Sequence, residues 1–312
     1  MRIPLGPVDI LTLAFISICV LLSVVFASVV PSWLWLVTQY ALISLVIIAL
    51  ASYARRPGAW KPVVTAYLFL PVIVLPIIFN SLGDLIPYLW PHYFDDLLIR
   101  VDHALFGVHP TVWLERFIHP LLTRIMQLAY ISYYPIPVAL GAVLIVKRKY
   151  DFFDEAIFGL ILCFYLSYLG YLLVPAVGPR FTLADLQTVT LQAGPLTVAI
   201  QETLNSLEHN KTDAFPSGHT AIALLSLYYG WKFREKTYTA ILVPTVLALV
   251  LSTVYLRYHY VIDVIAGVLL TALTIIIAPA LSRLLSRRSP SGSHDGATGS
   301  RGEPHDQFHN AS

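Results

Sequence analysis

Charge is scarce in this sequence. Only 12% of its 312 residues are Asp, Glu, Lys or Arg, which is about half the share found in soluble globular proteins. A soluble domain of this length could not cover its surface with so few charged side chains. The 57% of hydrophobic residues excludes intrinsic disorder for most of the chain. The composition therefore predicts a polytopic membrane protein.

Cysteine is almost absent as well. The sequence has two, Cys19 and Cys163, and each lies within an apolar run. Two such thiols argue against a disulfide framework and against a cysteine-ligated metal. The net charge is only +2, and no basic cluster of the kind that binds nucleic acid is present. We expect no cofactor, no bound metal and no nucleic-acid partner.

Long apolar runs fill most of the chain. A membrane-spanning helix needs about 20 predominantly apolar residues, and eight segments approach or exceed that length. They are approximately residues 10–30, 32–54, 60–83, 122–147, 151–176, 217–233, 237–256 and 260–283. We therefore predict an all-α, polytopic membrane helix bundle with about eight spans.

Lys and Arg are distributed unevenly between the two ends of these spans. Fourteen of the twenty lie at the chain termini or in the short loops on the same side, and six lie on the other side. Because basic residues concentrate on the cytoplasmic side, we expect both termini to be cytoplasmic. The two long loops, about 84–121 and 177–216, are then on the non-cytoplasmic face of what we expect to be the plasma membrane.

Three separated stretches at that face carry the candidate chemistry. They are Pro175–Phe181 with Arg180, Phe215–Thr220 with Ser217, Gly218 and His219, and Arg257–Asp263 with His259. We call them the first, second and third motifs.

The third motif has a histidine and an aspartate four residues apart, His259 and Asp263. On a helix these side chains share one face and can meet. An aspartate that accepts a hydrogen bond from one imidazole nitrogen fixes the tautomer and leaves the other nitrogen free as a nucleophile or base. The alternative is that the two side chains only pair with each other at a helix end and take no part in chemistry.

The second motif has the pattern of a helix N-terminus, with Ser217 as the capping residue. Free amides and the helix dipole at such an end favour a phosphate, and Gly218 permits its close approach. His219 could then donate a proton to a leaving oxygen. Arg180 and Arg257 suit phosphoryl oxygens because the guanidinium binds them through two nitrogens. The alternatives are an ordinary cap followed by an interfacial histidine, and arginines that snorkel to the membrane surface.

Pro-Ser-Gly-His at 216–219, followed by His-x3-Asp at 259–263, resembles the type 2 phosphatidic acid phosphatase superfamily. That superfamily includes vanadium haloperoxidases, sphingomyelin synthases and inositol phosphorylceramide synthases. The resemblance implies that His259 attacks phosphorus and becomes a phosphohistidine, that Asp263 orients it, and that His219 protonates the leaving group. It further implies phosphate binding by Arg180, Ser217 and Gly218. The addition of Arg257 to this set is our own inference from its position.

The resemblance also implies a division of the chain. Residues 60–283 would form the six-helix core, residues 1–59 an added two-span hairpin, and residues 284–312 a disordered cytoplasmic tail. The sequence departs from the phosphatase pattern at Leu173, Phe181 and Thr253, where the family has Lys, Pro and Arg. The runs 178–181, 257–263 and 102–107 are more similar to the inositol phosphorylceramide synthase branch.

We therefore predict a membrane enzyme that acts on a lipid phosphate ester at the outer leaflet. It is a phosphatase if water resolves the intermediate, and a phosphotransferase if an alcohol or polyol acceptor does. A haloperoxidase is disfavoured because those relatives are soluble. A non-enzymatic lipid translocator or carrier is the alternative class.

Two weaker patterns are interpreted conservatively. The first long loop contains His92, Asp95, Asp96, Asp102 and His103, and we favour a solvated amphipathic segment over a metal site. Tyrosines gather at positions 130, 133, 134, 165, 168 and 171. We favour an aromatic belt at the membrane interface over a lining for a lipid headgroup.

Overall fold

The computed structural model describes residues 5–286 apart from 192–193, 195–201 and 203–208. The regular elements in this part of the chain are all helices, and one isolated bridge joins Ala176 to Asp213. The all-α prediction is confirmed. The predicted tail, 284–312, lies almost wholly outside the described residues.

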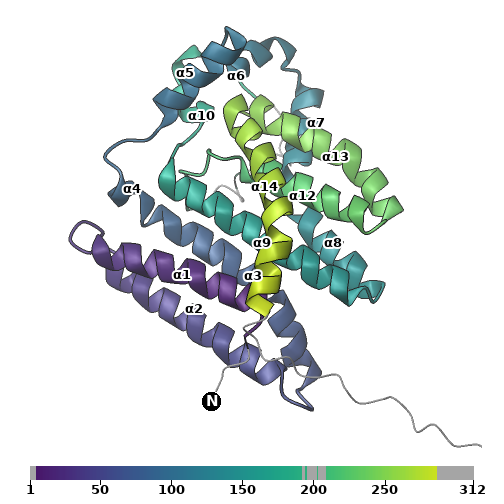
Figure 1. The fold of residues 1–312 in the computed structure, drawn as a ribbon. Helices are drawn as coiled ribbons and strands as arrows, with labels where there is room; N and C mark the ends of the chain where they lie inside the picture. The colour runs from purple at the N-terminus through teal and green to yellow at the C-terminus, as the bar shows by residue number, and fades with distance from the viewer. Residues whose placement is uncertain (1–4, 192–193, 195–201, 203–208, 287–312) are drawn as a thin grey trace, which may run out of the picture.

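Within the described residues, ten helices have twelve or more residues, and nine of them form the body of the bundle (Figure 1). They are α1 (Pro7–Val25), α2 (Trp33–Ala54), α3 (Lys61–Gly83), α7 (Pro120–Ile131), α8 (Pro135–Val146), α9 (Tyr150–Leu173), α12 (Gly218–Lys232), α13 (Lys236–Tyr255) and α14 (Val261–Ser286). The remaining elements lie in the long loops. They are α4 (Ile86–Leu89), α5 (Asp95–Phe106), α6 (Pro110–Trp113), η1 (Leu114–Phe117), α10 (Pro179–Thr182) and η2 (Ala184–Leu186).

The helix lengths identify an integral membrane protein. Within the described residues, α1, α2, α3 with α4, α9, α13 and α14 are long and apolar enough to cross a membrane. The α7–α8 pair is a further candidate that bends by 49°. It breaks just before Pro135, whose ring removes an amide donor. All eight expected segments are helical, but α12 has only 15 residues, fewer than a straight span needs.

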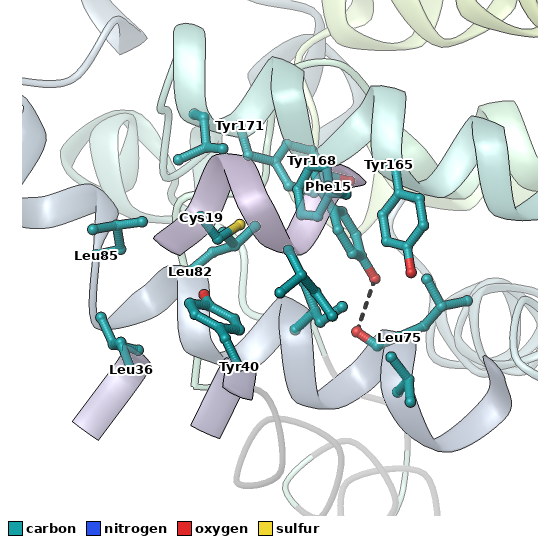
Figure 2. Close-up of a cluster of buried hydrophobic side chains, with 14 of the residues drawn as sticks. Phe15, Cys19, Leu36, Tyr40, Leu75, Leu82, Leu85, Tyr165, Tyr168 and Tyr171 are labelled. Atoms are coloured by element: carbon teal, nitrogen blue, oxygen red, sulfur yellow. Dashed lines mark hydrogen bonds between the residues drawn. The ribbon is translucent and has the colours of Figure 1, made fainter. Parts of the chain in front are cut away.

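The N-terminal hairpin α1–α2 packs against α3 and α9 through a shared apolar core. Figure 2 shows Phe15 and Cys19 of α1 among tyrosines of α9 and leucines of α3. Phe15 stacks on Tyr165 with ring centroids 4.6 Å apart. The Tyr165 hydroxyl of α9 donates to Thr12 Oγ1 of α1 at 3.1 Å. The hairpin is thus held to the bundle by both apolar packing and hydrogen bonds.

The basic loops and the three motifs lie at opposite ends of the bundle. At one end, Lys147 and Lys149 both pair with Glu235, and Arg55 pairs with Asp9. At the other end, α5, α6 and α10 gather around the motif loops (Figure 1). This separation is the one that the charge pattern requires. Which end faces the cytoplasm remains a prediction.

Cysteine labelling tests the predicted orientation. Native Cys19 and Cys163 are both 0% exposed, so they should react little with a membrane-impermeant maleimide. Asp96 and Asp151 are exposed at opposite ends of the bundle. In sealed right-side-out vesicles, Asp96→Cys should label directly, and Asp151→Cys only after permeabilisation. Labelling of both variants from the same side would contradict the orientation.

Candidate active site

The structure brings the three motifs together, although about 80 residues separate the first from the third. Three backbone hydrogen bonds join their loops: Ala214 N to Ala176 O at 3.0 Å, Arg180 N to Arg257 O at 2.9 Å, and Ser217 N to Asp263 O at 2.9 Å. The predicted convergence of the motifs at one end of the bundle is therefore found. These bonds also satisfy amides that would be costly to bury unpaired.

Two glycines allow the motif backbones to approach this closely. Gly178 has φ +88°, and a Cβ built there would lie 2.4 Å from the carbonyl oxygen of Tyr258. On α14, a Cβ at Gly267 would lie 2.6 Å from the carbonyl oxygen of Ser217. Any larger residue would push the first motif from the third, or α14 from the second.

Ser217 caps α12 as predicted. Its Oγ accepts from the Thr220 amide at 3.3 Å, and the side chain is fully buried. The first amides of α12, from Gly218 onward, lie at the free end of the helix, where an anion is favoured. Phosphate binding by Ser217 and Gly218 stays a prediction.

His259 is oriented by the backbone. Its Nδ1 donates to the Ala214 carbonyl oxygen at 2.7 Å, so Nε2 carries the lone pair. Asp263 lies 3.6 Å from Nδ1, which is an electrostatic contact but too long for a good hydrogen bond. The Asp263 carboxylate instead accepts from the Tyr260 amide at 2.8 Å. Burial lowers the pKa of His259, although the Asp213 charge and the hydrogen bond to Ala214 act in the opposite direction, and this favours the neutral ring.

His219 faces the reactive nitrogen of His259. Its Nδ1 lies 3.5 Å from His259 Nε2. Tyr130 stacks on the His219 ring at 4.5 Å, and Tyr133 lies at 4.2 Å. The Nε2 atom of His219 is buried and has no hydrogen-bond partner among the described residues. The aromatic-belt interpretation was wrong for Tyr130 and Tyr133, which enclose a candidate catalytic histidine.

Arg180 lies at the edge of the same aromatic group. Its guanidinium sits over the Tyr258 ring at 4.7 Å and over Phe181 at 4.6 Å. Tyr258 stacks in turn on Tyr130 at 4.4 Å. The rings of Tyr258 and Tyr130 therefore form a continuous stack from Arg180 to His219. Phe181, at the position where the phosphatase pattern has Pro, contributes directly to holding the arginine.

Arg257 is bound by protein acceptors. Its Nη2 donates to Glu115 Oε1 at 2.7 Å and to the Val189 carbonyl oxygen at 2.6 Å, and its Nη1 donates to Gln187 at 3.1 Å. Hydrogen bonds from Thr188 and the Arg257 charge keep the pKa of Glu115 low despite burial. In this structure Arg257 ties the second long loop to the third motif. Its Nε atom is buried and has no hydrogen-bond partner among the described residues, and its contact with phosphate stays a prediction.

Two carboxylates of α5 also reach the motifs. Asp95 and Asp102 are 5% and 1% exposed, and both accept hydrogen bonds from motif backbone. The expectation of a solvated segment was wrong for these two and right for the exposed Asp96. Their spacing of seven residues, which puts both on one helix face, was the signal that could have revealed them. Within the described residues, no group of three potential metal ligands converges.

A largely apolar groove of about 570 Å³ leads to His219. Its walls come from α3 and α8 and its floor from α9, with Phe79, Val138 and Phe164 among the lining residues. It extends from Ile145, near the end with the basic loops, to His219 and Asp213 at the motif end. Because its walls are membrane-spanning helices, the groove lies at the depth of lipid acyl chains.

The sequence model of the PAP2 superfamily matches residues 96–277, more than half of the chain. The chain belongs to the PAP2 superfamily. This match spans all three motifs and supports a lipid-phosphatase-type membrane enzyme. It confirms the resemblance at the level of the superfamily and leaves the inositol phosphorylceramide synthase branch a prediction.

A PA-phosphatase related-family protein of Dictyostelium discoideum is similar to this PAP2 protein. The two are 24% identical over 215 residues, which is 62% of this chain and 37% of the relative. The chain thus spans little more than a third of the relative's length. No solved structure matches the sequence.

Substitution of Gly267 tests the contact between the second motif and α14. Gly267→Ala should lower stability by about 1–3 kcal/mol, because its Cβ meets the backbone of Ser217 and one helix must shift. Thermal unfolding in detergent measures this. Gly141→Ala on α8 is the matched control, since its Cβ would be 3.4 Å from the Phe153 ring, an ordinary contact. Equal melting temperatures for the two variants would contradict the tight contact.

Proposed function

We propose that this PAP2 protein is a phosphatase or phosphotransferase that acts on a lipid phosphate ester at the non-cytoplasmic face of the plasma membrane. One observation carries the proposal: two histidines with facing nitrogens stand at the head of an apolar groove at membrane depth. The groove suits the acyl chains of a lipid, and the histidines suit the chemistry of its phosphate.

His259 is the proposed nucleophile. Its neutral Nε2 attacks phosphorus, the bond from phosphorus to the leaving oxygen breaks, and a proton carried by His219 goes to that oxygen. The product is a phosphohistidine at His259 and a lipid alcohol. Water or an acceptor hydroxyl then attacks phosphorus, the bond from phosphorus to His259 Nε2 breaks, and His219 takes up the proton of the attacking hydroxyl. Free phosphate or a phosphodiester leaves, and His259 recovers its neutral form. Splitting one displacement into two easier steps is the usual advantage of a covalent intermediate.

The negative charge that develops on the phosphoryl oxygens needs fixed donors. We assign this role to Arg180 and to the amides at the Ser217–Gly218 end of α12. Asp263 supports the charge that the His259 ring acquires during attack. Arg257 is the second cation of the prediction. Its Nη2 is paired with Glu115, and its Nε, which has no partner among the described residues, is the donor left for a phosphoryl oxygen.

Hydrolysis and transfer have separate support. The Dictyostelium relative is named a PA-phosphatase related-family protein, which favours a phosphatase. The similarity of residues 178–181, 257–263 and 102–107 to the inositol phosphorylceramide synthase branch favours transfer to a polyol. The groove alone would also serve a lipid carrier without chemistry. An assay that follows labelled phosphate separates these three outcomes.

His259→Ala tests the enzymatic proposal. With a lipid labelled in its phosphate, wild-type protein should form a labelled covalent intermediate and release phosphate, or pass it to an added polyol. The variant should lose both, with turnover lower by several orders of magnitude, because no other group replaces the nucleophile. Exposed His209 of the second long loop lies 3.0 Å from the Asp84 carboxylate and outside the motifs, so His209→Ala is the control. Near-normal turnover in His259→Ala would refute the mechanism, and an inactive wild type that still moves lipid would favour the carrier.

Filling the groove tests the lipid part of the proposal. Ala142→Phe on α8 places a ring in the groove and should reduce turnover of a long-chain lipid phosphate about tenfold, equivalent to about 1.4 kcal/mol of lost binding. Turnover of a short, water-soluble phosphate ester should change little. Ala240→Phe on the outer surface of α13 is the matched control. Equal losses for the two substrates would show that the acyl chains lie elsewhere.

A further inference from the structure

Two buried carboxylates of α5 have no part in the proposed chemistry and yet contact two of the three motifs. Asp95 and Asp102 are seven residues apart on α5, so they lie about 10 Å apart along one helix face. We call this pair the α5 clamp. A buried carboxylate is costly unless hydrogen bonds satisfy its oxygens, and both members of the clamp find their donors in the motif loops.

Asp95 joins the first motif to the third. Its Oδ2 accepts from the Val177 amide at 3.0 Å, and its Oδ1 accepts from the Gly178 amide at 2.9 Å. The same Oδ1 accepts from the hydroxyl of Tyr260 at 2.8 Å. Tyr260 directly follows His259, and Gly178 stands two residues before Arg180. One carboxylate thus holds both the arginine turn and the histidine loop.

The connection continues through two further contacts. The Tyr260 hydroxyl also lies 2.6 Å from Thr182 Oγ1 in α10, the short helix that carries Arg180. Asp102 accepts from the amides of Val261 and Ile262, each at 2.8 Å, and so caps the start of α14. The clamp therefore fixes α5, the first motif and the beginning of α14 as one unit.

We infer that Asp95 is a positioning residue for the reaction, which sets the placement of Arg180 relative to His259 through the Val177–Gly178 amides and Tyr260. The inference rests on the proposed function. Asp95 touches neither substrate nor reacting atoms. It acts through the geometry of groups that do, and small displacements of such groups are expensive in rate.

Three single variants test this on full-length protein with a labelled lipid phosphate. Asp95→Asn places an NH₂ group against an amide donor and should lower turnover about 10- to 100-fold. Tyr260→Phe removes only the hydroxyl that joins the two motifs and should lower turnover less. Asp96→Asn, a neutralisation of the adjacent exposed carboxylate, should have no effect. Thermal unfolding in detergent shows how much folded protein each preparation contains.

A double-mutant cycle separates positioning from general structural support. If Asp95 places Arg180, then Arg180→Ala should cost less in the Asp95→Asn background than in wild type, because the arginine there is already displaced. If Asp95 only stabilises the fold, the fold-losses in turnover of the two single variants should multiply to give the loss of the double variant. The same cycle between Tyr260→Phe and Arg180→Ala provides the result even if Asp95→Asn fails to fold.

The outcomes are distinct. Coupling in either cycle, with Asp96→Asn unchanged, supports the inference. Turnover of Asp95→Asn equal to that of Asp96→Asn, or losses that multiply in the cycles, overturns it while leaving the proposed function intact. A wild-type protein with no activity on any lipid phosphate overturns the proposed function and this inference together.

Discussion

The hydrogen bond from His259 to the Ala214 carbonyl oxygen decides what the site can do. It places the proton on Nδ1, which leaves Nε2 with its lone pair directed toward His219. Because the acceptor is the backbone of Ala214, which directly precedes the second motif, the ring orientation depends on that motif staying in register with the third. The bonds from Ala214 to Ala176 and from Ser217 to Asp263 maintain the register. The reactivity of one imidazole is therefore tied to three loops at once.

Acidic side chains organise the loops around a site proposed to bind an anion. Asp95, Asp102 and Glu115 are buried or nearly so, and each carboxylate has backbone amides among its donors. Two consequences follow. Their charge is satisfied locally, which limits its opposition to a phosphate, and the loops acquire fixed positions from these hydrogen bonds as well as from a small buried apolar cluster that includes Leu98, Ala176 and Tyr260. Glu115 also neutralises Arg257, which leaves Arg180 as the motif arginine stacked on the tyrosine rings.

The sequence predicted what depends on local pattern and missed what depends on distant partners. Apolar run length located all eight helical segments, and Pro-Ser-Gly-His located the cap at Ser217, because helices and caps are set by neighbouring residues. The ion pair of Arg257 with Glu115 joins residues 142 apart, and no spacing rule could reveal it. The same holds for the Ala214 carbonyl, since backbone acceptors leave no trace in residue type. The aromatic-belt interpretation was wrong for Tyr130 and Tyr133 because an aromatic belt and the lining of a site have the same amino-acid composition.

The N-terminal hairpin has a physical connection to the groove as well as to the core. The face of α3 that carries Val74, Ile78 and Leu82 packs into the cluster shared with α1, α2 and α9 (Figure 2). A second face, with Val72, Pro76 and Phe79, lines the groove. A helix wall beside lipid has no hydrophobic effect to hold it in place, because acyl chains are as apolar as its side chains. Packing on the hairpin supplies that support, with the Tyr40–Ser81 hydrogen bond at 2.7 Å adding a fixed register. The N-terminal hairpin therefore helps to shape the route by which we propose a lipid reaches His219.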